Sequence, residues 1–343
     1  MAQAFTLHEH AALAPHNTLH VAATARWLAE LREPDALPDL LAAPAAHGPV
    51  LVLGEGSNVL FAGDYPGLVL CPLFAGVRIL EDDGTTALVR AEAGAGWDAF
   101  VDWTLARGLA GLENLALIPG RVGATPIQNV GAYGVEVSEV ISCVEAWDRG
   151  QARRVRLTAR QCAFGYRDSI FKRDPARWIV TAVEYRLSRR APLRLDYAGV
   201  RDELAALGVA APTPQRVADA VRRLRRRKLP DPATIGNAGS FFKNPVVGAG
   251  FAARLRAAHG DAPVYPAGDR CKLSAAWLIE RCGWRGYRDG DAGIAAQHAL
   301  VLVNHGHATG TQLLALARRV ADSVQQNFGV RLEPEPRIVG AQW

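Results

Sequence analysis

The sequence predicts an α+β fold in which a strand-rich region is followed by a smaller α/β region. Two observations predict it. From about residue 49 to 185, short β-branched runs such as PVLVLG, GLVLC, VRILEDDG and WIVTAVEYRLS are separated by glycine-rich turns. From about 212 to 330, after the proline-rich boundary APTP, apolar periodicity indicates helix, loop, helix, strand and helix.

Individual elements follow from the spacing of apolar residues. In the first region, Trp97, Phe100, Val101 and Thr104 recur at helical spacing, and Gly108 offers a C-cap. FGYRDSIFK (164–172) fits a strand. In the second region we expect helices over 272–286, ending at Gly283, and over 311–329, with the buried strand HALVLVN between them. The second helix has an apolar face formed by Leu313, Leu316, Val320, Val324 and Phe328.

Composition limits the class of protein. The chain has 343 residues, of which 49% are hydrophobic and 21% charged, as in a globular protein with a sizeable core. No apolar run has the length of a membrane span, and the first residues do not form a secretory signal, so we expect a cytoplasmic protein without membrane partners. The five cysteines include no C-x-x-C pair and are expected to be free thiols. No histidine has metal-ligand spacing, so no metal is expected.

Positive charge is concentrated in one segment. Residues 149–228 contain 21 Lys and Arg against 7 Asp and Glu, whereas the rest of the chain is net acidic. RRLRRRK (222–228) follows an apolar stripe of Val217, Val221 and Leu224, so it fits the solvated face of a helix or an anion-attracting patch. No aromatic residues interleave it and no nucleic-acid motif accompanies it, which favours small anions over nucleic acid.

Two glycine-rich stretches are candidate cofactor loops. GEGSN (Gly54, Glu55, Gly56, Ser57 and Asn58) follows an apolar strand, but Val59 stands where the dinucleotide fingerprint G-x-G-x-x-G needs its last glycine. It fits either an anion nest for a diphosphate or a simple tight turn. LIPGRVGATPIQNVGAYGVEV (117–137) fits a long loop around a flat cofactor or an Ω-loop without a ligand.

Three further stretches carry reactive groups. FGYRDSIFK offers Arg167, whose planar fork suits a carboxylate. GNAGSFFKNP (236–245) offers Ser240, and LEPEPRIVG (332–340) holds Glu335 between two prolines. Only four of the 39 cationic residues are lysine, and three of these (Lys172, Lys228 and Lys243) border such stretches, which suggests positions that need a compact ammonium group.

The chain resembles the UDP-N-acetylenolpyruvoylglucosamine reductase family, in its type I form, through five motifs that occur in that family's order and spacing. These motifs are GEGSNVLF, IPGRVGATPIQNVGAYGVEV, FGYRDSIFK, KLPDP…GNAGSFFKNP and LEPEPRIVG. The resemblance covers nearly the whole chain. It implies a vanillyl-alcohol-oxidase/PCMH-type FAD-binding domain over 13–188, a tyrosine-bearing loop over 189–211, a substrate-binding domain over 212–330 and a C-terminal strand over 331–343 with a catalytic glutamate.

The resemblance also implies the activity and its residues. NADPH would reduce noncovalently bound FAD, and UDP-N-acetylglucosamine enolpyruvate would be reduced to UDP-N-acetylmuramate, a peptidoglycan precursor. Arg167, Ser240 and Glu335 match the catalytic positions, with Ser240 as the proton donor to C2. Cofactor-binding positions are Gly54, Glu55, Gly56, Ser57, Asn58, Pro119, Gly120, Gly123, Gln128, Asn129, Gly131, Ala132 and Tyr133. Substrate-binding positions are Tyr166, Tyr197, Lys228, Asn244 and Gln297.

Alternatives remain open at this point. An FAD-dependent alcohol or sugar oxidase of the same fold would not use NADPH, and a basic nucleic-acid-binding protein would hold no flavin. Tyr197 in LRLDYAGV fits either a lid over the nucleotide sugar or a core tyrosine on a strand, because Leu193 and Leu195 alternate with it.

Overall fold

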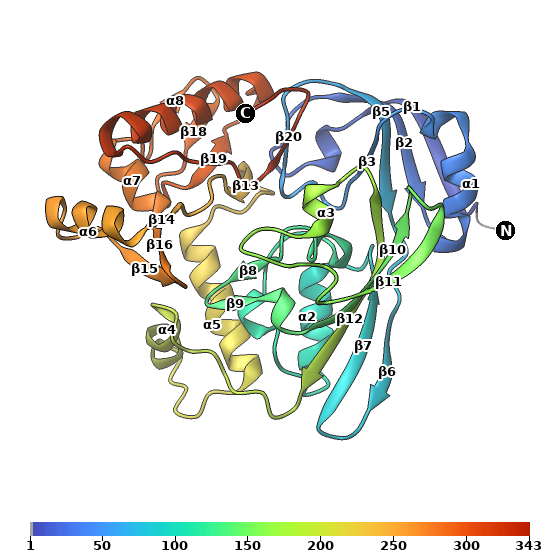
Figure 1. Ribbon diagram of the computed structural model, residues 1–343, viewed down its shortest axis with the longest axis horizontal. Helices are drawn as coiled ribbons and strands as arrows, with labels where there is room; N and C mark the ends of the chain where they lie inside the picture. Colours follow the sequence, from blue (N-terminus) through green and yellow to red (C-terminus); the bar gives the residue numbers. More distant parts are fainter. Residues whose placement is uncertain (1–2) are drawn as a thin grey trace. The chain divides into compact units, whose positions relative to one another are not determined.

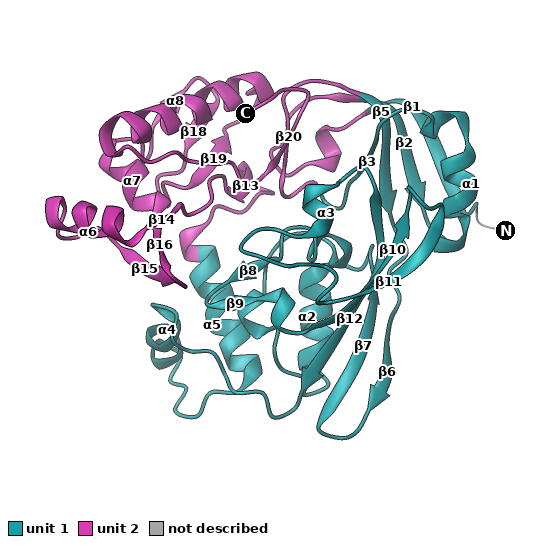
Figure 2. Cartoon of the chain, viewed as in Figure 1, with its two compact units in different colours: residues 1–11, 25–55, 66–226 teal, residues 12–24, 56–65, 227–343 magenta. Residues whose placement is uncertain are grey.

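The computed structural model describes residues 3–343, which divide into two compact units (Figure 2). Unit 1 comprises residues up to 11, 25–55 and 66–226, and unit 2 comprises 12–24, 56–65 and 227–343. Both units are therefore discontinuous in sequence, and the crossover near residue 55 falls inside the first glycine-rich loop. No helix in the described residues is long and apolar enough to cross a membrane.

Unit 1 contains two larger sheets and the two-stranded pair β8 (Gly131–Ala132) and β9 (Val135–Glu136). The first has the order β1-β2-β5-β3, in which β3 and β5 are parallel. Its strands are β1 (Phe5–Ala12), β2 (Thr24–Leu31), β3 (Val50–Val52) and β5 (Tyr65–Pro72). The second sheet is antiparallel, with the order β11-β10-β12-β7-β6. Its strands are β6 (Val77–Asp82), β7 (Thr86–Glu92), β10 (Ile141–Asp148), β11 (Arg153–Thr158) and β12 (Trp178–Ser188).

Helix α1 (Leu37–Ala42) packs on the first sheet, because its buried Leu37 and Leu40 share a core with residues of β2, β3 and β5. The other helices of unit 1 join the core on the second sheet (Figure 1); they are α2 (Trp97–Leu105), α3 (Ile170–Arg173), α4 (Val200–Ala206) and α5 (Pro214–Lys228). Trp97 and Phe100 of α2 pack on Tyr185 of β12, with ring centroids 6.1 and 5.0 Å away. The predicted helix at 97–104 is confirmed, because its periodic residues are those that are buried. The stripe of α5 joins the same core.

Unit 2 is built on the sheet β13-β19-β18-β17 and the smaller sheet β14-β16-β15. The strands are β13 (Gly236–Ser240), β14 (Val246–Gly248), β15 (Val264–Ala267), β16 (Arg270–Leu273), β17 (Arg288–Asp289), β18 (Ala292–Ile294) and β19 (Val301–Asn304). The helices are α6 (Ala249–Ala258), α7 (Ala275–Arg281) and α8 (Gly310–Phe328). β4 (Val59–Phe61) pairs in parallel with the last strand, β20 (Arg337–Val339), so the residues after GEGSN lie beside the C-terminal motif.

Sequence periodicity predicted α8 and β19 well but was wrong in two places. The predicted helix over 272–286 is only α7, because Lys272 belongs to β16 and pairs with both neighbouring strands; Ser274 then caps the helix by accepting a hydrogen bond from Trp277 N. The segment 164–172 is not a strand. Gly165 and Asp168 exchange two backbone hydrogen bonds of 3.0 and 3.2 Å around a tight turn, and α3 follows.

Candidate active site

The second glycine-rich loop (117–133) is held in a conformation that most residues avoid. Leu117, Asn129 and Tyr133 have φ angles of 59°, 49° and 50°. Non-glycine residues in this region are uncommon, and they persist only where the surroundings hold them there. Asn129 provides part of this support, because its buried amide donates to Glu136 Oε2 (2.7 Å) and Gly165 O (3.1 Å) and accepts from Ser138 N (3.0 Å). The Asn129 side chain therefore makes its hydrogen bonds to other residues of the protein and holds the loop in place.

The start of the first loop is tied to the second within unit 1. Glu55 Oε2 accepts a hydrogen bond from Gly120 N at 2.9 Å, and Glu55 also pairs with Arg121 at 3.3 Å. In unit 2, Gly56 has φ 63°, and a Cβ there would lie 2.1 Å from His16 O, so only glycine fits. Within unit 1, Glu55 and the loop 117–133 are linked, and a loop that is rich in backbone donors and held at positive φ fits the diphosphate and the ring of FAD.

Arg167 lies at the tip of the turn that replaces the predicted strand, with φ 54°. Its Nη2 donates to Gly131 O at 2.6 Å, and its guanidinium lies 5.2 Å from the centroid of the Tyr166 ring. Lys172 Nζ donates to Arg167 O at 3.1 Å. The turn thus places the predicted charge-stabilising arginine against Gly131 of the cofactor loop.

Ser240 ends a bulged strand in unit 2. The register of β13 on β19 passes from Asn237↔Val303 to Ser240↔Val301, so three steps on one strand match two on the other. Gly239 absorbs the extra residue with φ 66°, and its N–H donates to Asn237 Oδ1 at 3.0 Å. Bulges redirect side chains and occur often next to active sites. Here the bulge lies immediately before Ser240.

Glu335 lies beside the end of the same strand. Its N–H donates to Phe241 O at 2.8 Å, and Phe242 and Pro334 form an isolated β-bridge. Asn58 of the first loop donates to Glu335 O at 3.4 Å. Unit 2 therefore brings together Ser240, Glu335 and Asn58, three predicted site residues from distant parts of the sequence.

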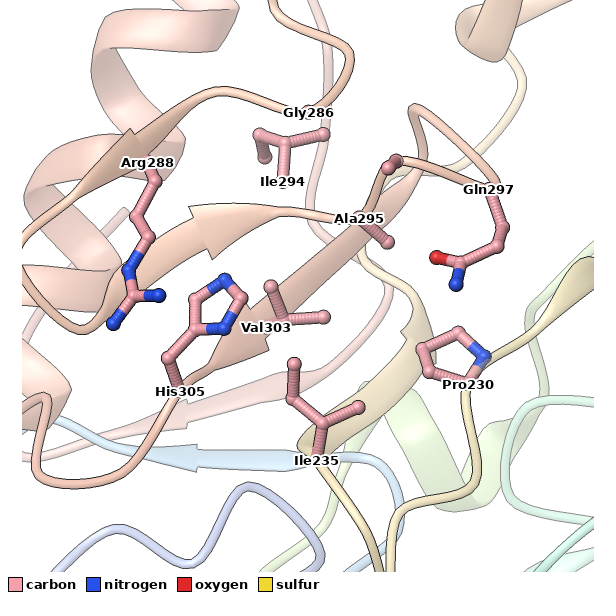
Figure 3. A pocket seen from close by; sticks show the side chains of 10 residues that line it. Pro230, Ile235, Gly286, Arg288, Ile294, Ala295, Gln297, Val303 and His305 are labelled. Carbon is pink, nitrogen blue, oxygen red and sulfur yellow. The ribbon is translucent and has the colours of Figure 1, made fainter.

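The substrate-binding candidates of unit 2 have different surroundings. Asn244 Oδ1 accepts from Ala275 N (2.9 Å) at the start of α7. The positive charge of Lys228 acts on His298, whose pKa is lowered first by burial and then by this lysine. Gln297 is exposed and lines a pocket whose apolar residues include Ile235 and Val303. Gln297 lies next to Pro230 on one side of this pocket, and Arg288 and His305 lie on the other (Figure 3).

Tyr197 is not a core residue on a strand. LRLDYAGV has no strand, the Tyr197 side chain is 43% exposed, and its ring packs edge-on against Tyr133 with centroids 5.0 Å apart. The structure therefore places the predicted lid tyrosine against a predicted cofactor-loop tyrosine.

Comparison with known proteins decides the family. The model of the UDP-N-acetylenolpyruvoylglucosamine reductase C-terminal domain matches residues 231–339, and an FAD-binding-domain model matches 12–158. The UDP-N-acetylenolpyruvoylglucosamine reductase of Xanthomonas campestris pv. campestris (strain B100) is 57% identical over 340 residues, 98% of this chain and 97% of the relative. The chain belongs to the UDP-N-acetylenolpyruvoylglucosamine reductase family.

Other members of the reductase family agree. The enzyme of that name from Xanthomonas euvesicatoria pv. vesicatoria (strain 85-10) is 57% identical over 341 residues, 98% of this chain and 97% of the relative. The crystal structure of the Thermus caldophilus reductase has a TM-score of 0.66 at 26% identity and covers 98% of both chains. The predicted α+β fold with an FAD-binding domain is confirmed, and so is the prediction of an FAD-dependent oxidoreductase.

Two residues of this reductase were missed by sequence reasoning. Asn237, which holds the bulge, also donates to Pro230 O (3.1 Å) and Ile235 O (2.9 Å). Arg225 bonds to the loop 117–133 from α5. A signal for Arg225 existed, because it follows Ala218 and Val221 at spacings of seven and four on the apolar side of the helix. It was hidden in a run of similar arginines.

Proposed function

We propose that this reductase converts UDP-N-acetylglucosamine enolpyruvate to UDP-N-acetylmuramate with NADPH as the reductant, and that Arg167, Ser240 and Glu335 are its catalytic residues. Family membership and the FAD-binding domain support the overall reaction. One observation carries the assignment of roles: Ser240 lies at the end of a bulged strand whose next carbonyl, Phe241 O, binds the N–H of Glu335.

The chemistry explains why these residue types are needed. When bound, FAD supplies the hydride, obtained from NADPH, that reaches the methylene carbon of the enol ether. Negative charge then develops at C2 and in the adjoining carboxylate, and C2 must take up a proton. A cation and hydrogen-bond donors placed where this charge develops lower the barrier, which is the role we assign to Arg167 and, as a protonated carboxyl, to Glu335.

Ser240 would give its hydroxyl proton to C2. A serine hydroxyl is a weak acid, so a cation or a proton relay has to assist it. Lys243 lies three residues after Ser240. Its ammonium group forms an ion pair with the Glu333 carboxylate at 3.0 Å, and its backbone N–H donates to the Glu333 carbonyl oxygen at 3.0 Å. This ion pair reduces the effect of the lysine charge on Ser240, so we favour Lys228 as the assisting cation.

We assign a separate role to each of four segments of the chain. We propose that residues 13–188 hold FAD, that 189–211 carry the substrate-covering loop, that 212–330 hold the nucleotide sugar, and that 331–343 position Glu335. The two family matches, to 12–158 and 231–339, support the first and third tasks. A cytoplasmic location is part of the proposal, supported by cysteines that are all free thiols, three of them buried.

Anaerobic mixing tests the reaction directly. Adding NADPH to the FAD-loaded enzyme should bleach the flavin absorbance, and adding the enolpyruvyl substrate should restore it in a 1:1 ratio with product formed. If oxygen but not the substrate restores the absorbance, the protein is an oxidase of the same fold and the proposal is wrong.

Tyr197→Ala should raise the substrate KM and leave the melting temperature within about 1 °C of the wild type. The ring is 43% exposed and contacts Tyr133 rather than a core, so its removal leaves no buried cavity. Tyr185→Ala is the matched control. This tyrosine is fully buried, so its replacement by alanine should lower the free energy of unfolding by ~3–5 kcal/mol. An unchanged KM in Tyr197→Ala would remove this residue from the substrate site.

A further inference from the structure

Arg225 has only neutral hydrogen-bond partners, whereas Arg216, Arg222 and Arg223 of the same helix pair with carboxylates. Its Nε donates to Leu117 O at 3.2 Å, and its side chain hydrogen-bonds the Tyr133 hydroxyl. Within residues 3–343 no carboxylate forms an ion pair with it. Asp98, the acidic group that acts on it electrostatically, is bonded instead to Arg222 at 2.8 Å.

Burial of this charge is costly. Removal from water lowers the pKa of Arg225 below its ordinary value, yet an arginine side chain stays protonated in a protein. A half-buried cation with neutral partners has lost hydration without gaining a counter-charge. The neighbours on α5 do not carry this cost, because Arg222 pairs with Asp98 and Asp102, and Arg223 pairs with Glu203.

The partners of Arg225 show where a counter-charge would bind. Leu117 and Tyr133 begin and end the cofactor loop, and the Tyr133 ring packs on Tyr197, the proposed substrate lid. A guanidinium has five N–H donors in a rigid fork, of which Leu117 O and the Tyr133 hydroxyl use only part. The fork matches the geometry of phosphate oxygens and suits bidentate binding.

We propose that Arg225 is a binding residue for a nucleotide diphosphate, supplied either by FAD or by the UDP-linked substrate. The inference rests on the proposed function, since that reaction brings both diphosphates to the protein. It adds to the loop 117–133 of unit 1 a half-buried guanidinium that the sequence motifs did not name.

The test compares Arg225→Gln and Arg225→Lys with Arg226→Gln. Arg226 is the next residue and is exposed, so its substitution removes the same charge from the same helix. In the first arm, FAD is titrated into each apoenzyme and its fluorescence quenching is followed. In the second arm, UDP is titrated into each FAD-saturated enzyme and the flavin absorbance is followed. Arg225→Gln retains a hydrogen-bond donor for Leu117 O. Arg225→Lys retains the positive charge, and it can be tested even if Arg225→Gln does not fold.

Loss of a charge-assisted contact to phosphate should weaken binding about 10- to 100-fold in Arg225→Gln, less in Arg225→Lys, and less than twofold in Arg226→Gln. The ratio of the Arg225→Gln dissociation constant to that of the wild type should become smaller at high salt. A loss in the FAD arm identifies the cofactor diphosphate, and a loss in the UDP arm identifies that of the substrate. Unchanged dissociation constants in both arms, with only a lower melting temperature, would overturn the proposal. Failure of the wild type to bind UDP would instead contradict the proposed function.

Discussion

The Ser240→Ala variant is expected to accept hydride from NADPH at nearly the wild-type rate and to lose ~10²–10⁴-fold in the rate at which the enolpyruvyl substrate reoxidises the flavin. The hydroxyl is needed only when C2 takes up its proton, so its removal raises the barrier of one half-reaction. Stopped-flow absorbance at the flavin band measures the two half-reactions separately. In heavy water, the wild type should incorporate one deuterium at C2.

The control is Ser274→Ala, which removes a hydroxyl from the same unit. Ser274 caps α7 by accepting from Trp277 N at 3.2 Å, so its loss should cost ~1 kcal/mol of stability and leave both half-reactions intact. Equal slowing of both half-reactions in Ser240→Ala would show that Ser240 maintains the bulge rather than donating a proton.

Arg167→Ala is expected to raise the barrier of substrate reduction by ~3–4 kcal/mol, the usual cost of removing one group that stabilises developing charge. Arg167→Lys should restore little, because a lysine cannot reproduce the planar fork that now bonds Gly131 O at 2.6 Å. Single-turnover reoxidation of the reduced enzyme by the substrate measures both variants.

Arg173→Ala is the matched control in the same segment. Arg173 bonds Asp168 (2.8 Å) and Ala163 O (2.7 Å) at the surface, so its loss should change neither half-reaction. Weakened FAD retention together with slow reduction by NADPH in Arg167→Ala would mean that Arg167 mainly supports the cofactor loop. Full activity of Arg167→Lys would contradict a bidentate role.

Periodicity alone predicted the regular elements whose burial pattern matches their geometry. In α8, Leu313, Leu316, Val320 and Val324 are buried as their spacing required, and Gly329 ends the helix with φ 67°. The short strand runs between 49 and 185 likewise became β3, β5, β6, β7 and β12. In these segments the local preference and the tertiary contacts favour the same conformation.

The site depended on the sequence for its residue types and on tertiary structure for its geometry. The motifs named Arg167, Ser240 and Glu335, but Arg167 lies on a turn and Ser240 follows a bulge. Gly165 and Asp168 close the turn locally, but Asn129, distant in sequence, donates to Gly165 O at its start. The bulge depends on the register on β19, which is also distant in sequence. A strand pattern has period two and cannot signal an added residue or a left-handed turn.

Sequence by itself therefore determined the family and the fold class, and it supplied the candidates for the reactive groups, because these depend on residue identity and on order along the chain. Only the tertiary structure decided which groups meet. It placed Tyr197 against Tyr133, Glu335 beside Phe241, and Arg225 of α5 against Leu117 of the loop 117–133. Burial and counter-charge depend on neighbours in space. The six arginines between 216 and 227 look alike in the sequence, but they differ once α5 packs, because Arg225 becomes half-buried whereas exposed ones such as Arg226 keep their water.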